Sequence, residues 1–278
     1  MRIAVDHSTR YRYDSPVYLE PHVFRLRPRE DGMQRLVHWT FDITPEPLGR
    51  TLCLDHNGNV VVRAWFQGIT SELCLRSRFE IETLRENPFD YLLSLADPQL
   101  PMEYAHPLRS TLAPFLDDAQ PVEVCDFGRR LAEECGYRTV PFLSTLNLRL
   151  CEITRQVIRH VGAPLPAEVT LRTREGSCRD LAVLFCAVCR SVGLAARFVS
   201  GYERDASLEE NGDLHAWAEV YLEGGGWRGY DPSRGLAVAT AHVAVAAAAA
   251  AAMAAPVTGS YRGAARAKLE FSISMQVA

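Results

Sequence analysis

The chain has 278 residues, of which 47% are hydrophobic and 23% are charged, and its formal net charge is −4. This length holds one large domain or two of ordinary size, with the composition of a soluble globular protein. A slightly acidic chain lacks the basic surface that binding to nucleic acid requires. The arginines at positions 10, 12, 25, 27 and 29 alternate with apolar residues, which favours the outer face of strands over a binding patch.

The first residues, MRIAVDHSTRYRYDSP, contain no apolar core of signal-peptide length, so no secretory signal is expected. No apolar run is long and lipophilic enough to span a bilayer, so no membrane partner is expected. The eight cysteines show no disulfide spacing, which predicts reduced thiols in a cytoplasmic protein. Because no EF-hand loop, phosphate-binding loop or dinucleotide fingerprint is present, we expect no cofactor.

Residues 1–85 show the pattern of antiparallel strands. Short alternating runs are separated by clusters of Pro and Gly, and Asn57-Gly58 is a turn signal suited to positive φ angles. These features predict an antiparallel β-sandwich or barrel. Residues 86–120 are rich in Pro and turn residues, which predicts a linker with one or two short helices. Asn211-Gly212 predicts a further turn, at the tip of a loop between two later strands.

Two helices are expected after the linker. The first runs from Pro121 to Gly136, with Asp118 as its candidate cap, because apolar residues recur there at helical spacing. The second is expected between Ser144, as its cap, and Gly162, since another apolar stripe continues over this segment.

The most informative stretch is GSCRDLAVLFCAVCR, at residues 176–190. Gly176-Ser177 predicts a turn and a cap, and the apolar spacing that follows predicts a helix ended by Gly193. Cys178 then lies in the first helical turn, where the macrodipole and unpaired N–H groups favour a thiolate. We expect Gly176 and Ser177 to lie beside a bound substrate, because glycine lets a backbone approach closely.

Two expected strands supply the partners of the thiol: residues 214–222 carry His215, and residues 227–231 end at Asp231. A three-residue loop at 223–225 makes Asp231 oppose Trp217, on the same face as His215 and diagonal to it. A loop of two or four residues would place the carboxylate on the other face unless a bulge intervened. In the favoured register Asp231 accepts a hydrogen bond from one imidazole nitrogen and leaves the other for Cys178, as in a catalytic triad.

Each of these residues also has a purely structural interpretation. A helical Cys is usually a small buried hydrophobe, which is how we interpret Cys186 and Cys189. An isolated His is more often a satisfied strand residue, and an Asp before Pro is usually a turn former. A zinc site formed by Cys178, Cys186, Cys189 and His215 is a rival interpretation. Because these cysteines lie in an apolar helix without a second metal-binding knuckle, we expect no metal.

The segments GSCRDLAVLFCAVCRSVGLAARFVSGY and HAWAEVYLEGGGWRGYDPSRG resemble the core of the transglutaminase-like superfamily in its bacterial form. The resemblance is strong over residues 145–240 and extends weakly to the N-terminus, on YRYDSPV, RLRPRE and DHNGNVVV. It implies an α+β fold: a papain-like transglutaminase core over residues 121–278, with helices packed on an antiparallel sheet, preceded by the antiparallel β-sandwich-like domain. The last strand, expected at 267–277, returns to one domain or the other.

The resemblance implies that Cys178, His215 and Asp231 are the catalytic residues and that Trp217 walls the cleft. The implied reaction is attack on a carboxamide or peptide carbonyl of a peptide or protein substrate, through a thioester. Water as the acceptor gives hydrolysis by a cysteine protease or amidase, and an amine gives acyl transfer. The resemblance brings no calcium site and no cofactor. The alternative is a catalytically weak or inactive fold that acts as a peptide- or protein-binding module.

Residues 244–255, AVAAAAAAAMAA, depart from the family's pattern. Bacterial members usually run through a polar, Gly-Arg-Asp-containing turn near the active-site side at this point, and the resemblance resumes only at Tyr261-Arg262-Gly263. Alanine favours a helix. The missing polar side chains predict altered substrate handling or lost activity, which supports the alternative of a binding module. The sequence leaves open the substrate, the acyl acceptor and the oligomeric state.

Overall fold

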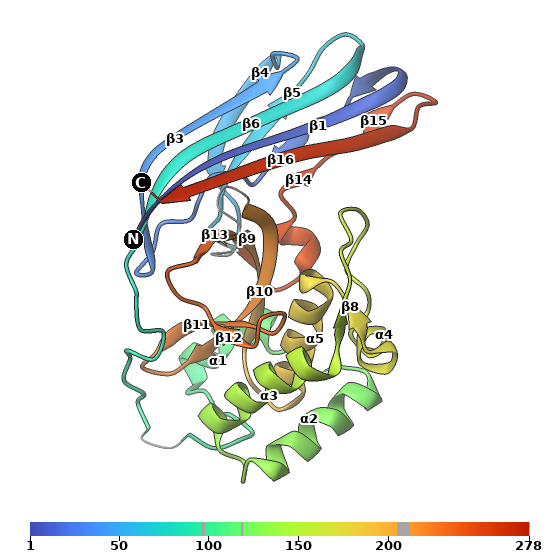
Figure 1. Ribbon diagram of the computed structural model, residues 1–278. Coiled ribbons are helices and arrows are strands. Elements are labelled where there is room, and N and C mark those ends of the chain that lie inside the picture. The colour runs from blue at the N-terminus through green and yellow to red at the C-terminus, as the bar shows by residue number, and fades with distance from the viewer. Residues whose placement is uncertain (96–97, 118, 205–211, 278) are drawn as a thin grey trace.

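The computed structural model describes residues 1–95, 98–117, 119–204 and 212–277. The expected cap Asp118 and the expected turn residue Asn211 lie outside these residues. The described chain has a β-sandwich at one end and a group of helices at the other, with a separate five-stranded sheet between them (Figure 1). Among the described residues, no helix is long and apolar enough to cross a membrane.

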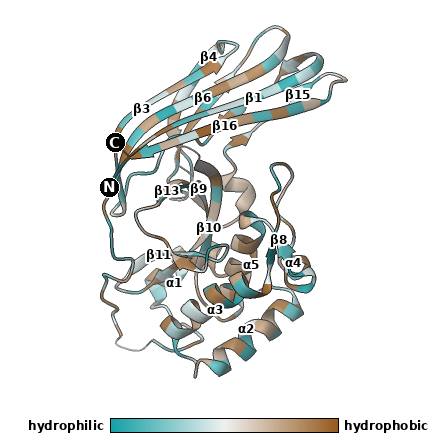
Figure 2. Cartoon of the chain, viewed as in Figure 1, coloured by the Kyte–Doolittle hydropathy of each residue, from teal (hydrophilic) through white to brown (hydrophobic). Residues whose placement is uncertain are grey.

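The sandwich consists of two antiparallel sheets. One has the order β15-β1-β6-β3, with β16 also paired to β1, and the other has the order β14-β2-β5-β4. Hydrophobic and hydrophilic residues alternate along these strands (Figure 2), and the apolar faces of the two sheets pack together around Phe24, Phe41 and Leu73. The strands are β1 (Arg2–Leu19), β2 (His22–Phe24), β3 (Gln34–Thr44), β4 (Gly49–Leu54), β5 (Val60–Trp65), β6 (Thr70–Thr83), β14 (Val257–Thr258), β15 (Tyr261–Arg262) and β16 (Ala267–Val277).

The predicted sandwich is therefore confirmed, and the chain completes it with strands from its C-terminal part. β16 returns to the sandwich rather than to the core, pairing with β1 from Ile3 opposite Val277 to Tyr13 opposite Ala267. In Figure 1 the first and last strands lie side by side. The core is thus inserted between two parts of the sandwich.

The core packs helices on a five-stranded antiparallel sheet of order β12-β11-β10-β9-β13. Its helix α5 is central, because Leu184, Phe185 and Val188 pack both on neighbouring helices and on Val220 of the sheet. The helices are α1 (His106–Leu112), η1 (Ala113–Phe115), α2 (Val122–Glu134), α3 (Thr139–Ile153), α4 (Ala167–Thr173), α5 (Cys178–Ser191) and η2 (Ala251–Ala254). The strands are β7 (Arg155–Gln156), β8 (Glu175–Gly176), β9 (Ala196–Arg204), β10 (Gly212–Leu222), β11 (Gly226–Asp231), β12 (Leu236–Ala237) and β13 (His242–Ala248).

The helical predictions hold in part. The short helices of the linker and the helix before Gly136 are confirmed as α1, η1 and α2, and Gly136 has a φ of +61°. The second helix, α3, begins at Thr139 rather than Ser144 and ends at Ile153 instead of reaching Gly162. The chain becomes extended because β7 pairs in parallel with β8, the strand that leads directly into the Cys segment.

The first part of the Ala-rich segment, residues 244–248, is strand and not helix, so helix propensity misleads there. β13 is buried along its whole length between β9 and the sandwich, and only Ala251–Ala254 form a short helical turn. Val243 and Val245 pack on the sandwich, while Ala246 and Ala248 pack with residues of α5 and β9. Tertiary packing selects small side chains here and overrides their local preference.

The free edge of β13 is covered by two amide side chains of the sandwich. Gln34 donates Nε2–H to the carbonyl of Ala244 and accepts from its N–H, both at 2.8 Å. Asn59 makes the same pair of bonds to Ala247, at 3.0 and 2.9 Å, and Arg29 N–H donates to Ala244 at 2.9 Å. Each amide thus replaces a neighbouring strand and closes an edge that would otherwise be open.

Replacing Gln34 with Ala should destabilise the protein. The change removes both bonds to Ala244 and leaves the buried N–H of that residue without its acceptor, a loss of about 2–3 kcal/mol in the free energy of unfolding. Gln67→Ala is the matched control, because Gln67 is exposed. Urea unfolding of both variants measures the difference, and equal stability would contradict the role given to the amide.

A buried histidine predicts acid sensitivity. His7 of β1 hydrogen-bonds Tyr202 of β9 at 2.7 Å, and burial lowers the pKa of His7 to about 4. Since an unfolded His titrates near 6.5, stability is complete above that pH and declines as the pH falls towards 4, by at most about 3 kcal/mol. Unfolding measured across this range should show the decline in the natural chain, and a flatter curve in His7→Gln.

Candidate active site

Cys178 is the first residue of α5, as predicted, and Ser177 is its cap. The backbone N–H and the hydroxyl of Ser177 both donate to one carboxylate oxygen of Asp180 at 2.7 Å. The other oxygen accepts from Arg159 at 2.6 Å and from the N–H of Leu165 at 2.7 Å. The buried carboxylate of Asp180 therefore fixes the start of the helix, and with it the position of the thiol.

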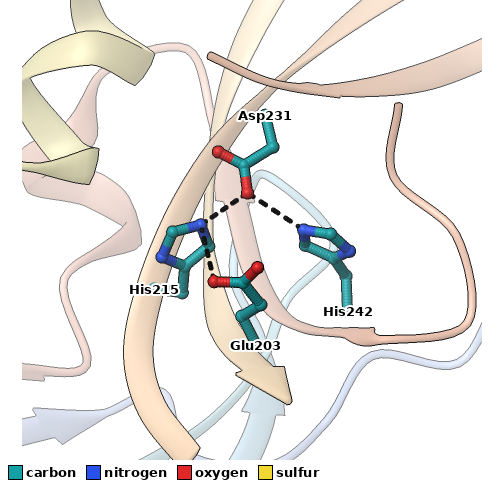
Figure 3. A group of neighbouring side chains, drawn as sticks. All are labelled: Glu203, His215, Asp231 and His242. Atoms are coloured by element: carbon teal, nitrogen blue, oxygen red, sulfur yellow. Dashed lines mark hydrogen bonds and ion pairs between the residues drawn. The ribbon is translucent and has the colours of Figure 1, made fainter. Parts of the chain in front are cut away.

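The hairpin after His215 has the predicted register. Leu222 pairs with Gly226 and Ala218 with Tyr230, so the loop has three residues and Asp231 falls on the face that carries His215. Nε2 of His215 lies 2.7 Å from Oδ2 of Asp231. Figure 3 shows the other ring nitrogen pointing away from this carboxylate.

That second nitrogen, Nδ1, is the one left for the thiol, and Cys178 and His215 line the same cavity. Burial lowers the pKa of His215, but the interactions with Asp231 and Cys178 outweigh it and raise the pKa to about 10. The imidazole is therefore protonated at neutral pH. An imidazolium beside a thiol favours its thiolate form.

Asp231 is fully buried and surrounded by donors. Its Oδ1 accepts from the hydroxyl of Ser233 at 2.7 Å and from the N–H groups of Ser233 and Arg234, at 3.0 and 3.3 Å. Its Oδ2 accepts from His215 and, at 3.1 Å, from Nε2 of His242. Burial acts to raise the pKa of Asp231, but the bonds to His215 and His242 prevail and hold it below its usual range. The side chain is a carboxylate.

The thiol and the imidazole open on a cavity of about 920 Å³ between the core and the sandwich. Core residues of its lining include Cys178, His215 and the loop 156–164, while the sandwich contributes His7, Thr9 and Tyr11 of β1 and Leu269 and Phe271 of β16. The loop reaches across to the sandwich, since the ring of His160 meets that of Phe271 edge-on at 5.1 Å. The sandwich is thus one wall of the candidate site.

Comparison with known proteins agrees with this architecture. Residues 3–82 match the model of the bacterial transglutaminase-like N-terminal region, and residues 147–232 match that of the transglutaminase-like superfamily. The chain belongs to the transglutaminase-like superfamily. The second match spans the Cys segment and the His and Asp strands, so the sequence resemblance is confirmed at the level of family and fold.

Relatives of this transglutaminase-like chain include uncharacterized mycobacterial proteins. One from Mycobacterium leprae is 25% identical over 99% of this chain and 98% of its own length. One from Mycobacterium tuberculosis is 29% identical over 88% of this chain and 82% of its own length. A crystal structure from Cytophaga hutchinsonii, described as a "putative cysteine protease", superposes with a TM-score of 0.72. It covers 99% of this chain and 90% of that one at 20% identity, which shows a shared fold.

Two of the three residues expected to contact substrate lie away from the cavity of this transglutaminase-like site. Ser177 lines it, but Trp217 is 1% exposed and packs among Val199, Val238 and Ala247, so the expectation that it walls the cleft is wrong. The indole lies over Gly201 of β9 and reaches the alanines of β13, the next strand of the same sheet. Gly176 is also buried, and a Cβ there would lie 3.0 Å from Asp180, so its small size serves packing rather than substrate approach.

The zinc ligands considered from the sequence do not come together in the transglutaminase-like core. Cys186 and Cys189 are buried in its apolar interior, where desolvation raises the pKa of both thiols. Among the described residues, Glu203, His215, Asp231 and His242 instead place potential ligand atoms within 4.8 Å of one another. Sequence reasoning missed Glu203 and His242, because neither belongs to a local motif and β13 reaches the site only by pairing with β9.

Replacing Asp231 with Asn should lower the pKa of His215. The variant removes the negative charge that holds the proton on the imidazole while the burial remains, so we expect a fall of at least about one pKa unit. NMR titration of labelled imidazole measures it. Asp126→Asn, at a partly exposed position of α2, is the control, and an unchanged His215 pKa in Asp231→Asn would contradict the electrostatic account.

Proposed function

We propose that this protein is a thiol-dependent enzyme that cleaves a carboxamide or peptide bond of a peptide or protein substrate and passes the acyl group to water or an amine. Two observations carry the proposal: Nε2 of His215 is hydrogen-bonded to the buried carboxylate of Asp231, and Cys178, at the start of α5, lines the same cavity as His215. These groups supply the nucleophile, the proton carrier and its orienting partner.

In the first step the thiolate of Cys178 attacks the carbonyl carbon. A C–S bond forms, and the carbonyl π electrons move to oxygen. Because Cys178 is the first residue of α5, N–H groups of that helix turn without intrahelical acceptors lie beside the developing oxyanion. As the intermediate collapses, the C–N bond breaks and Nδ1 of His215 gives its proton to the departing amine or ammonia, leaving a thioester.

In the second step the neutral imidazole of His215 takes a proton from water or from an acceptor amine as that group attacks the thioester. The C–S bond breaks, Cys178 leaves as a thiolate, and His215 is protonated again. Asp231 keeps Nε2 protonated and directed away from the thiol throughout, so that Nδ1 alone exchanges protons with the reactants.

The cleft supports a peptide substrate rather than a small polar one. Tyr11, Leu269 and Phe271 give the sandwich wall an apolar character. Ala251, Ala252, Ala254 and Ala255 also line the cavity, so the segment that departs from the family's pattern faces the proposed substrate with small apolar side chains. This placement supports altered substrate handling.

Alkylation tests the nucleophile. At about pH 6, an ordinary exposed thiol is less than about 1% ionised, so iodoacetamide should label Cys178 at least about tenfold faster than the partly exposed Cys53, Cys74 and Cys125. His215→Ala should remove this preference, since the imidazolium is lost. Peptide mapping by mass spectrometry gives the rate at each position, and equal rates at all four cysteines would contradict the proposal.

Turnover separates the enzyme from a binding module. A library of peptide amides should leave an acyl adduct on Cys178, and ammonia or amine should be released, with both signals absent in Cys178→Ala. Peptide binding that survives this substitution, without any release from the natural chain, would instead identify a binding module.

A further inference from the structure

Four side chains with metal-ligand atoms meet behind the imidazole of His215. Oδ2 of Asp231 lies 2.7 Å from Nε2 of His215 and 3.1 Å from Nε2 of His242, while Oε2 of Glu203 lies 3.6 Å from Nε2 of His215. Figure 3 shows the two rings on either side of Asp231, with the carboxylate of Glu203 beside them. Glu203 and His242 are not needed to explain the proposed thiol chemistry.

This spacing is close to that of a tetrahedral zinc site. Bonds of 2.0–2.1 Å to zinc place neighbouring ligand atoms about 3.3 Å apart. Three of the six separations between these atoms, 2.7, 3.1 and 3.6 Å, bracket that value, and the other three are no longer than 4.8 Å. Two imidazoles and two carboxylates suit Zn²⁺ or Co²⁺, whereas Ca²⁺ and Mg²⁺ prefer oxygen ligands alone.

Charge and access also fit a divalent ion. When His215 releases its Nε2 proton on binding, two carboxylates and two neutral imidazoles balance a charge of +2. The four ligands and the ion then carry no net charge at a place where each of these side chains is at most 11% exposed. The guanidinium of Arg234 neutralises Glu203 at 2.9 Å in this structure, and an ion takes over that role. Glu203 and His215 line the cavity, so the ion enters from the cleft.

The geometry points to a binding site for a divalent transition metal, Zn²⁺ or its substitute Co²⁺, formed by Glu203, His215, Asp231 and His242. The bound ion occupies the place of the proton between His215 and Asp231. With Nε2 coordinated, the imidazole keeps its proton on Nδ1 and no longer accepts one from a reactant. The metal is therefore a reversible inhibitor, a consequence that rests on the proposed function, whereas binding itself does not.

Cobalt spectroscopy on the full chain tests the site. In Cys178→Ala, Co²⁺ should give the intense visible bands of tetrahedral coordination without a sulfur-to-cobalt charge-transfer band, and Zn²⁺ should displace it. His242→Asn keeps an N–H donor beside Asp231 but removes a ligand, so Co²⁺ affinity should fall by at least about tenfold in the Cys178→Ala background. His56→Asn, at an exposed position of the β4–β5 turn, is the matched control and should bind as before.

Any of three results would overturn the site. Cys178→Ala fails to bind Co²⁺, the natural chain shows a sulfur-to-cobalt band, or His242→Asn in the Cys178→Ala background binds Co²⁺ with unchanged affinity. Ammonia release then separates the two proposals. If the natural chain turns over a peptide amide, Zn²⁺ should lower the rate, and His242→Asn should need at least about tenfold more Zn²⁺ for the same fractional loss. A chain that binds Co²⁺ as described but releases no ammonia contradicts the proposed enzyme and leaves the metal site standing.

Discussion

The hydrogen bonds of Gln34 and Asn59 to the free edge of β13 hold the sandwich against the core. They satisfy backbone groups that are buried and would otherwise be unpaired, which is costly in free energy. Through them the N-terminal region becomes a wall of the cleft instead of a separate module. The same strand begins at His242, so the edge that joins the two parts also delivers a partner to Asp231.

The sequence alone predicted correctly the features that depend on residues close together in the chain. The cap and helix start at Ser177 and Cys178, and the register of the hairpin that carries His215 and Asp231, depend on neighbours in sequence, and the structure agrees with both. The place of Trp217 was mispredicted, because strand alternation gives two faces but not what packs on each. The indole lies over Gly201 and packs with Val238 and Ala247, so it is buried instead of lining a cleft.

In two segments that flank the site, tertiary contacts also decided the secondary structure against the local helix preference. The apolar stripe expected to continue the helix α3 to Gly162 instead passes into β7, whose pairing with β8 supports the turn before Cys178. Residues 244–248 of the Ala-rich segment form a strand because they pair with β9, and Ala246 and Ala248 pack closely with residues of α5 and β9. Neither outcome can be derived from a window of neighbouring residues, since the partner segments lie far away in the chain.

The pairing of Ile3 with Val277 joins two strands that lie far apart in the sequence, near the beginning and the end of the described residues. Contacts between residues so far apart in sequence form late and slowly during folding. The chain loses conformational entropy when the long loop closes, before the contacts add to stability. Until β16 docks, the edge of β1 remains a template for association with other chains. Leu269 and Phe271 belong to that strand, so this part of the wall is synthesised after the thiol, and the groove is complete only once β16 has paired with β1.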